Sequence, residues 1–342
     1  MKRIIFAIGA IALLMFFAAC TKPPKAPGEL DIAVFVPGVV SGSPIYELLV
    51  AGAEKAVMET ANATIKVIEA GYNQAEWLDR LKAVAATEEY ELIVTSNPSM
   101  PELCAQVASE YPKQKFFIAD AYLKGNSAIY TVLYNQKEQG YIAGYLAGLY
   151  SKELHSSGTV KVGLIAAQRY PTLDELILPG FEAGVKAVDQ AYAISYREIG
   201  NWYDANAAAN LARELYTSTV DVILPIAGGA GQGVISVSEE LAANGKRIVW
   251  FDNAGFTVAP KSVIGCAILK QDIVVYERVR AILNGNTAAF GRADIVGVRD
   301  GYIDFDGNGP GYQNLPDTIK NAMSKMIEAL KKGVPDFTIS SF

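Results

Sequence analysis

LDIAVFVPGVVSGSPIYELLVAGAEKAVMETANATIKVIE, residues 30–69, contains the first repeat of the pattern that decides the fold. Residues 32–36 and 65–68 are short apolar runs rich in β-branched side chains, and residues 46–60 between them have helical periodicity. The runs predict buried strands, and the stretch between them predicts an amphipathic helix. A strand, a helix and a second strand in this order indicate a parallel pair, because parallel strands need a crossover connection.

The same alternation continues along the chain. Further strands are predicted at 92–95, 116–119 and 129–133, with helices at 76–87 and 101–111. After a long helix, 136–152, a second series has strands at 161–166, 193–198, 220–226 and 247–251 and helices at 176–188, 205–216 and 231–244. Alternating strands and helices predict an α/β fold with parallel sheets. The two series therefore predict two Rossmann-like lobes.

The end of the chain contains too few elements for a third lobe. It supplies a strand at 262–269, a helix at 272–283, an extended stretch at 293–305 and a final helix at 317–332. We expect the lobes to share them, with residues 30–134 and 256–285 in the N-terminal lobe and residues 135–255 and 286–342 in the C-terminal lobe. The chain then crosses between the lobes three times, near Asn135, Gly255 and Asn286, and the crossings form a hinge below a cleft.

The N-terminus has the layout of a lipoprotein signal peptide. A basic start precedes an apolar run, residues 4–17, and small residues lead to Cys20. The run is shorter than the roughly 20 apolar residues that an ordinary membrane-spanning helix needs, so residues 1–20 predict a cleaved signal with a lipidated Cys20. Residues 21–29 are rich in proline and predict a tether. We expect the chain to lie on the periplasmic side, anchored by this lipid; an uncleaved helical anchor is the alternative.

Composition argues against several classes of function. The net charge is −6 without basic clusters, which argues against a nucleic-acid partner. His155 is the single histidine of the sequence, so Ser-His-Asp, Cys-His and histidine-metal sites lack support. Cys104 and Cys266 lie in a helical and a strand pattern and predict two buried thiols rather than a disulfide. We expect a protein that is not an enzyme and that holds neither a metal nor a cofactor.

Two motifs resemble known binding loops but depart from them. AGGAGQGV, residues 227–234, follows a strand and opens a helix, yet its glycines lack the G-x-G-x-x-G spacing of a dinucleotide site. It predicts a tight turn that allows a ligand to approach the backbone closely. DFDGNG, residues 304–309, imitates an EF-hand loop, but Leu315 stands where the bidentate Glu is required, so a plain turn is predicted.

Polar and aromatic residues that follow the predicted strands are the candidate ligand-binding residues. They are Ser43, Tyr46, Asn97, Asp120, Asn201, Trp202, Tyr203, Asp252 and Lys270, with Gly228 and Gly229 in the glycine turn. Ligands of open parallel sheets bind beyond the carboxyl ends of the strands. Aromatic rings with a few hydrogen-bonding groups suit a flat ligand with polar edges. The residues alone therefore predict a small planar heterocycle.

Several stretches resemble the basic membrane protein family of solute-binding lipoproteins, which includes the nucleoside receptors of ABC importers. The resemblance rests on NQKEQGYIAGYLAG (135–148), GFEAGVKAV (180–188), the glycine turn and Lys270. It covers essentially the whole mature chain. It implies the type I periplasmic binding protein fold, a small molecule held between the lobes and an ABC permease as partner.

The resemblance also implies roles for single residues. Trp202 matches the aromatic residue that stacks on the base in nucleoside-binding members, and Asp120, Asp252 and Lys270 match polar ones. The acidic first-loop signature D-D-x-S-F-N of the family is replaced here by GVVSGSPIY, residues 38–46. This departure favours a wider planar ligand than a purine nucleoside. The pattern is similar to the riboflavin-binding lipoproteins of spirochaetes within the family.

We therefore expect riboflavin as the transported ligand, with its ring system on Trp202 and Tyr46, and a monomeric chain. A purine nucleoside is the alternative ligand. Two hypotheses from other classes stay open. One is an exported nucleoside hydrolase that uses Asp120 and Asp252 as acid and base. The other is a surface receptor with the same fold that takes no part in transport.

Overall fold

The computed structural model describes residues 29–155, 160–339 and 342. The predicted signal peptide, the predicted lipidation site Cys20 and nearly all of the predicted tether lie outside these residues. Within the described ranges, no helix combines the length and the apolar character that crossing a bilayer requires.

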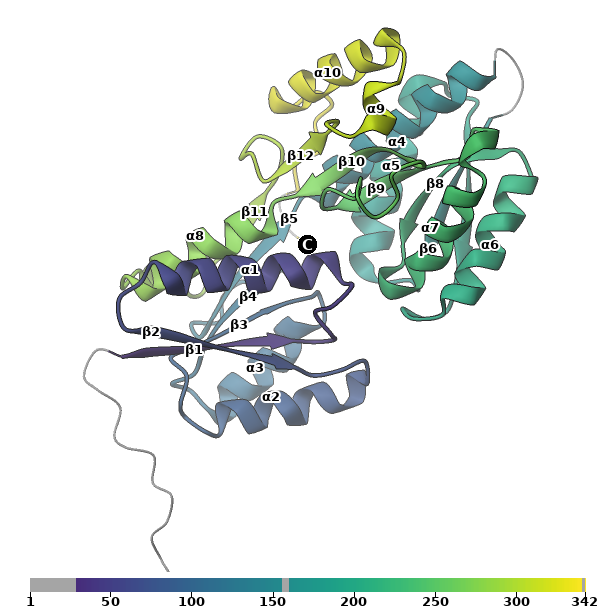
Figure 1. The fold of residues 1–342 in the computed structure, drawn as a ribbon. Coiled ribbons are helices and arrows are strands. Elements are labelled where there is room, and N and C mark those ends of the chain that lie inside the picture. The colour runs from purple at the N-terminus through teal and green to yellow at the C-terminus, as the bar shows by residue number, and fades with distance from the viewer. Residues whose placement is uncertain (1–28, 156–159, 340–341) are drawn as a thin grey trace, which may run out of the picture.

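The first lobe is built on a six-stranded parallel sheet (Figure 1). Its strands are β1 (Leu30–Val36), β2 (Ala63–Glu69), β3 (Leu92–Ser96), β4 (Lys115–Ala119), β5 (Ile129–Tyr134) and β11 (Ala293–Val296), in the order β11-β5-β4-β3-β1-β2. The inner strands are buried along nearly their whole length, whereas β2 at the edge is half-exposed. Continuous apolar runs form these inner strands because helices cover both faces of the sheet.

Two pairs of helices cover the first sheet. One face packs against α1 (Pro44–Met58) and α8 (Gln271–Leu283), and the other against α2 (Trp77–Ala85) and α3 (Met100–Glu110). A Cβ atom at Gly52 of α1 would lie 2.4 Å from the carbonyl oxygen of Asp272, so glycine allows α1 and α8 to touch. This contact attaches α8, from late in the sequence, to the first lobe.

The second lobe repeats the arrangement. Its strands are β6 (Lys161–Ala166), β7 (Ala193–Glu198), β8 (Val220–Ile226), β9 (Arg247–Asp252), β10 (Val263–Leu269) and β12 (Ile303–Asp306), in the order β12-β10-β9-β8-β6-β7, with β12 antiparallel. The helices α4 (Gln136–Leu154) and α5 (Leu178–Val188) cover one face, and α6 (Ala205–Thr217) and α7 (Gly231–Glu240) cover the other. The short α9 (Pro310–Gln313) precedes α10 (Asp317–Lys331), which packs on α4. The predicted two-lobe α/β class is confirmed.

Two strands lie in the other lobe from the one predicted. β10 falls in segment 256–285 but pairs with β9 and β12, and β11 falls in segment 286–342 but pairs with β5. The second and third crossings therefore lie at Lys270 and between β11 and β12, and the predicted positions near Gly255 and Asn286 are wrong. Local apolar patterns identify a strand but carry no information about its partner, which is fixed by pairing between distant segments.

The three crossings are hydrogen-bonded to one another. The backbone N–H of Asn135, at the first crossing as predicted, donates to the carbonyl of Val296 at 2.8 Å. The N–H of Lys270, at the second crossing, donates to the carbonyl of Tyr302 at 2.8 Å. These bonds tie the three connections together where they pass between the lobes.

Smaller predictions have clear outcomes. Cys104 and Cys266 are buried free thiols in the described chain, as predicted. The helix predicted over 231–244 ends earlier, at Glu240, and a 3₁₀ turn carries the chain to Gly245, whose φ of 79° ends it. A plain turn also follows β12, where the side chain of Asp306 accepts from the N–H of Asn308 at 2.9 Å.

Candidate functional site

A cavity of about 750 Å³ lies between the two lobes. Its walls are the segments that follow β1, β2, β3 and β4 in the first lobe and β6, β7, β8 and β9 in the second. The carboxyl ends of both sheets thus face one space, which is the expected place for a ligand in open parallel sheets. Cavities of roughly 300–1,000 Å³ hold ligands the size of cofactors and drugs.

Ten of the eleven predicted ligand-binding residues line this cavity. They are Ser43, Tyr46, Asn97, Asp120, Asn201, Trp202, Tyr203, Gly228, Gly229 and Asp252. Lys270 is not in the wall, and its ammonium group forms an ion pair with Asp304 at 3.0 Å. The strand before Lys270 belongs to the outer part of the second sheet, so its end leads into the hinge and not into the cavity.

Trp202 presents an indole ring on the second-lobe wall, next to a second aromatic ring. The centroids of the Trp202 and Tyr170 rings are 5.8 Å apart, with an angle of 51° between the planes. The glycine turn holds the Trp202 loop, because the N–H of Ala230 donates to the Trp202 carbonyl at 2.9 Å. Gly228 has a φ of 51°, and a Cβ atom there would lie 3.2 Å from Cε3 of Trp202. Glycine is therefore favoured at position 228 for two reasons: the turn has a positive φ, and the indole leaves little space for a side chain.

Tyr46 forms part of the opposite wall, in the first turn of α1. Its hydroxyl donates to the carbonyl of Pro37 at 3.0 Å and accepts from Nδ2 of Asn97 at 3.2 Å. Burial raises the pKa of Tyr46 to about 12, so this hydroxyl stays neutral. Because the hydroxyl already donates one hydrogen bond and accepts another within the protein, the aromatic ring is the part of Tyr46 that can contact a ligand.

Three residues at strand ends have backbone conformations that most amino acids avoid. The φ angles are 120° at Asn97, 53° at Asp120 and 73° at Asp252. Asn and Asp enter the left-handed region more readily than other non-glycine residues, but not without strain. Such strain persists where the surrounding structure imposes it, often at ligand sites. Here it occurs at three positions that line one cavity, two in the first lobe and one in the second.

The described lining of the cavity carries acidic side chains and no Lys, Arg or His. Burial, together with a smaller contribution from the nearby charge of Asp252, raises the pKa of Asp120 to about 7. Burial also raises the pKa of Asp252 to about 6, although a hydrogen bond from Nε2 of Gln139, 3.2 Å long, opposes this shift. The side chain of Glu47 accepts from the N–H of Gly42 at 3.1 Å. This electrostatic environment suits an uncharged or cationic ligand and disfavours an anion.

Sequence reasoning missed several wall residues. Tyr170 and Gln168 follow β6, and Tyr72 follows β2, so the strand-end criterion that selected Trp202 applies to all three. Tyr72 and Tyr203 approach each other from opposite lobes, with ring centroids 6.4 Å apart. Both rings are more than half exposed, which places this contact at the mouth of the cavity.

Comparison with known proteins gives a family match over nearly the whole folded chain. The model of a family described as "Bmp: ABC transporter substrate-binding protein PnrA-like" matches residues 30–340. Basic membrane protein B of Borrelia garinii is 24% identical over 325 residues, which are 89% of this chain and 88% of that protein. The ABC transporter nucleoside-binding protein BmpA of Lactococcus lactis is 27% identical over 157 residues, 46% of this chain and 43% of that protein. The chain spans about half the length of the first curated relatives that it matches.

A solved structure agrees with the fold. An ABC transporter solute-binding protein from Aeropyrum pernix K1 superimposes with a TM-score of 0.78 and 18% identity, over 89% of this chain and 92% of that one. At this identity the likeness shows the fold alone. It confirms the two-lobe architecture expected for type I periplasmic binding proteins.

Proposed function

Because the chain belongs to the Bmp family of ABC transporter substrate-binding proteins, we propose that it captures riboflavin between its lobes and delivers it to a membrane importer. The observation that carries the proposal is the wall of the cavity, which combines aromatic rings from both lobes with carboxyl groups and, among the described residues, has no basic side chain. The family consists of binding proteins, so the cavity is interpreted as a place of capture without turnover.

The aromatic groups fit a flat ring system. Trp202 and Tyr170 provide adjacent rings in the second lobe, and Tyr46 provides a ring in the first. The isoalloxazine of riboflavin has three fused rings and offers two broad faces. Stacking of a flat heterocycle on one aromatic side chain contributes about 1–3 kcal/mol. A ligand held between the walls contacts both lobes at once.

The polar groups fit an uncharged ligand with several hydrogen-bond donors. Riboflavin carries the hydroxyls of its ribityl chain and one ring N–H, and Asp252 and Asn97 offer acceptor oxygens at the cavity wall. Flavin mononucleotide carries the same rings with a phosphate. Because acidic groups line the cavity, we expect the phosphate to be repelled.

A purine nucleoside is the second candidate. The named function of the Lactococcus lactis relative favours it, and nucleosides are also flat and uncharged. Two features of this chain favour riboflavin instead. The loop of residues 38–46 contains no carboxylate to hold a ribose, and the cavity of about 750 Å³ accommodates a ligand larger than a nucleoside.

Capture is proposed to work by closure of the lobes. Tyr72 and Tyr203 meet at the mouth, and the three crossings provide the hinge. A ligand that touches both walls stabilises the closed form by its additional contacts there. We propose that the permease recognises this closed form. We further propose that a lipid on Cys20 keeps the monomeric protein at the membrane on its periplasmic side.

The test is to purify the protein without refolding, record its visible spectrum, and then identify any molecule released on denaturation by its mass. Riboflavin stacked on Trp202 gives a yellow protein whose flavin fluorescence rises on release. A colourless preparation that releases a purine nucleoside would contradict riboflavin and support the second candidate. Catalytic cleavage of added nucleosides would contradict both.

A further inference from the structure

Asp120 and Asp252 enter the same cavity from different lobes. Asp120 follows β4 of the first sheet, and Asp252 ends β9 of the second. Asp252 is near enough for its charge to raise the pKa of Asp120. Because the lobes are joined by a hinge, the separation of these two carboxyl groups depends on how far the lobes have closed.

The groups around this pair do not neutralise it. The hydroxyls of Tyr46, Tyr134 and Tyr170 are close enough to feel the charge of Asp120. Burial raises the pKa of all three phenols, so they are neutral. Gln139 of α4 donates to Asp252 and is also neutral.

Among the described residues, the charged side chains close to the cavity either are acidic or lie outside its wall. Lys270, which follows β10 beside β9, is paired with Asp304. Glu47 on α1 lines the cavity and is acidic, whereas Asp272 and Arg278 of α8, whose charges oppose each other at Tyr134, do not line it. In the part of the chain that the structure describes, no cation balances Asp120 and Asp252 from the wall of the cavity.

One carboxyl oxygen of Asp120 has no hydrogen-bond partner within the protein. Of the side-chain atoms in residues 29–155, 160–339 and 342, Oδ1 of Asp120 is among the few that are buried without a hydrogen-bond partner. A buried carboxyl oxygen without a partner costs about 1–3 kcal/mol or more if charged. Two carboxylates that share a poorly hydrated site do not both stay ionised at neutral pH, because their repulsion is not screened by water.

We propose that Asp120 takes up a proton when the lobes close on the ligand, and that the resulting acid donates a hydrogen bond to an acceptor atom of the ligand. Asp252 stays ionised and accepts from a ligand N–H or hydroxyl. The cavity then requires a ligand with an acceptor and a donor at its polar edge, such as the carbonyl and N–H of a cyclic imide or amide. The inference rests on the proposed binding in this cavity, but it holds for either candidate ligand.

A pH dependence of affinity follows from this proton uptake. Ligand binding takes up about one proton once the pH exceeds the pKa of Asp120 in the free, open protein. Above that pH, each further unit weakens binding about tenfold, until the complex itself loses the proton. The protein therefore binds its ligand more tightly at mildly acidic pH than at alkaline pH.

The experiment is isothermal titration of riboflavin, and in parallel inosine, at pH 8 in buffers with different ionisation enthalpies. The expected result is uptake of about one proton per ligand by the unaltered protein. Asp120→Asn keeps a hydrogen-bond donor at this position and cannot titrate, so its affinity becomes independent of pH above about pH 7, where Asp252 is ionised, and its proton uptake at pH 8 falls to zero. Asp272→Asn is the matched control, since Asp272 does not line the cavity, and it keeps the proton uptake.

Tight binding without proton uptake by the unaltered protein would overturn the proposal. Repeating the titration with sodium replaced by a bulky organic cation distinguishes uptake of a proton from uptake of a sodium ion. Only sodium uptake depends on which salt is present. If inosine binds with proton uptake and riboflavin does not bind, the proposed ligand is wrong and the proton uptake stands. If neither ligand binds, the proposal is overturned together with the proposed ligand.

Discussion

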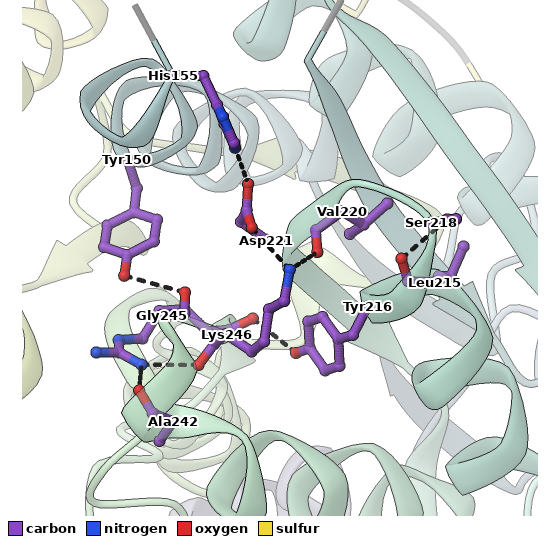
Figure 2. A network of polar contacts seen from close by, with 11 residues as sticks. Tyr150, His155, Leu215, Tyr216, Ser218, Val220, Asp221, Ala242, Gly245 and Lys246 are labelled. Atoms are coloured by element: carbon purple, nitrogen blue, oxygen red, sulfur yellow. Dashed lines mark hydrogen bonds and ion pairs between the residues drawn. The ribbon is translucent and has the colours of Figure 1, made fainter.

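Two aspartates at opposite ends of the second sheet have contrasting surroundings. Asp221, at the start of β8, has a side chain that is 9% exposed and is held by Lys246 Nζ at 2.8 Å and His155 Nε2 at 2.5 Å (Figure 2). Asp252, at the end of β9, accepts from the neutral amide of Gln139 and faces a cavity whose described wall contains no basic side chain. The residue type and the sheet are the same, but the partners differ.

The start of the sheet is a closed network. Lys246 also donates to the carbonyl of Val220 at 2.8 Å, and the hydroxyl of Tyr216 donates to the carbonyl of Arg247 at 2.8 Å (Figure 2). The hydroxyl of Tyr150, on α4, donates to the carbonyl of Gly245 at 3.1 Å (Figure 2). These bonds join β8 and β9 to the helices beside them. Asp221 is therefore held by basic partners within the protein, whereas Asp252 faces the cavity with one neutral partner.

The largest expected effect on stability comes from Asp221→Asn. Loss of the carboxylate leaves Lys246, whose side chain is 17% exposed, without its charge partner. Removing one member of a buried ion pair is strongly destabilising, and we expect a loss of about 2–3 kcal/mol because Lys246 retains some contact with water. Urea denaturation at pH 7 measures it. A loss below about 0.5 kcal/mol would contradict a structural role for the network.

Asp252→Asn is the matched substitution at the other end of the sheet. The pKa of Asp252 is raised from 3.8 to about 6, so its contribution to stability is present below about pH 4 and is lost as the pH rises through 6. Asparagine does not ionise, so the ligand-free variant gains stability relative to the unaltered protein above pH 6. Urea curves at pH 4.5 and pH 8 measure this difference. If Asp252→Asn is instead less stable than the unaltered protein at pH 8, the carboxylate of Asp252 supports the fold as that of Asp221 does, and the contrast between the two residues is wrong.

Trp202→Ala has the largest expected effect on binding by a single ring. The indole is proposed to stack on the flavin, and its loss should weaken binding by about 1–3 kcal/mol. Tyr203→Ala is the control, because this residue is 67% exposed and contacts Tyr72 at the mouth of the cavity, and it should weaken binding less. Calorimetric titration of both variants distinguishes them. An unchanged dissociation constant for Trp202→Ala would exclude this residue from the site.

Gly228→Ala should have an intermediate effect. The new methyl group meets Cε3 of Trp202 at 3.2 Å and displaces the indole, so we expect binding to weaken about fivefold, close to 1 kcal/mol. Gly285→Ala has a comparable positive φ, 89°, but its Cβ atom meets no neighbour within 4 Å. Both variants should lose about 1 kcal/mol of stability from backbone strain. Equal affinities in the two variants would contradict the role of the glycine turn in holding Trp202.

Lys270→Ala should have the smallest effect. The side chains of Lys270 and Asp304 are 28% and 31% exposed, and ion pairs of this kind contribute about 0–1 kcal/mol. Ligand affinity should change less than about twofold, since Lys270 does not line the cavity. The same titration measures it. A tenfold weaker affinity would restore Lys270 as a binding residue, as the family resemblance implies.

The sequence predicted what depends on local pattern. The alternation of strands and helices follows from apolar periodicity, and the cavity residues Asn97, Asp120 and Asp252 follow from their places at strand ends. The partners of β10 and β11 depend on pairing between segments far apart, so their lobes were predicted incorrectly. Lys270 satisfied the strand-end criterion, but its strand leads into the hinge.

Which residues of the site contact one another could not be predicted from the sequence. The contact of Trp202 with Tyr170 depends on how two loops pack, and neither loop predicts it alone. Among the described residues, no lysine, arginine or histidine lines the cavity beside Asp120 and Asp252. The sequence could not predict this, because it contains many lysines and arginines and their positions relative to the cavity depend on the fold.

The most direct measurement is a titration of the ligand-free protein with riboflavin, flavin mononucleotide and inosine at pH 6.5, followed by flavin fluorescence and by calorimetry. We expect saturable quenching by riboflavin at one site and binding of the mononucleotide at least about 100-fold weaker, or about 2.7 kcal/mol, because of its phosphate. Binding of inosine with no binding of riboflavin would contradict the proposed ligand, and equal affinity for the two flavins would contradict the electrostatic account of the cavity.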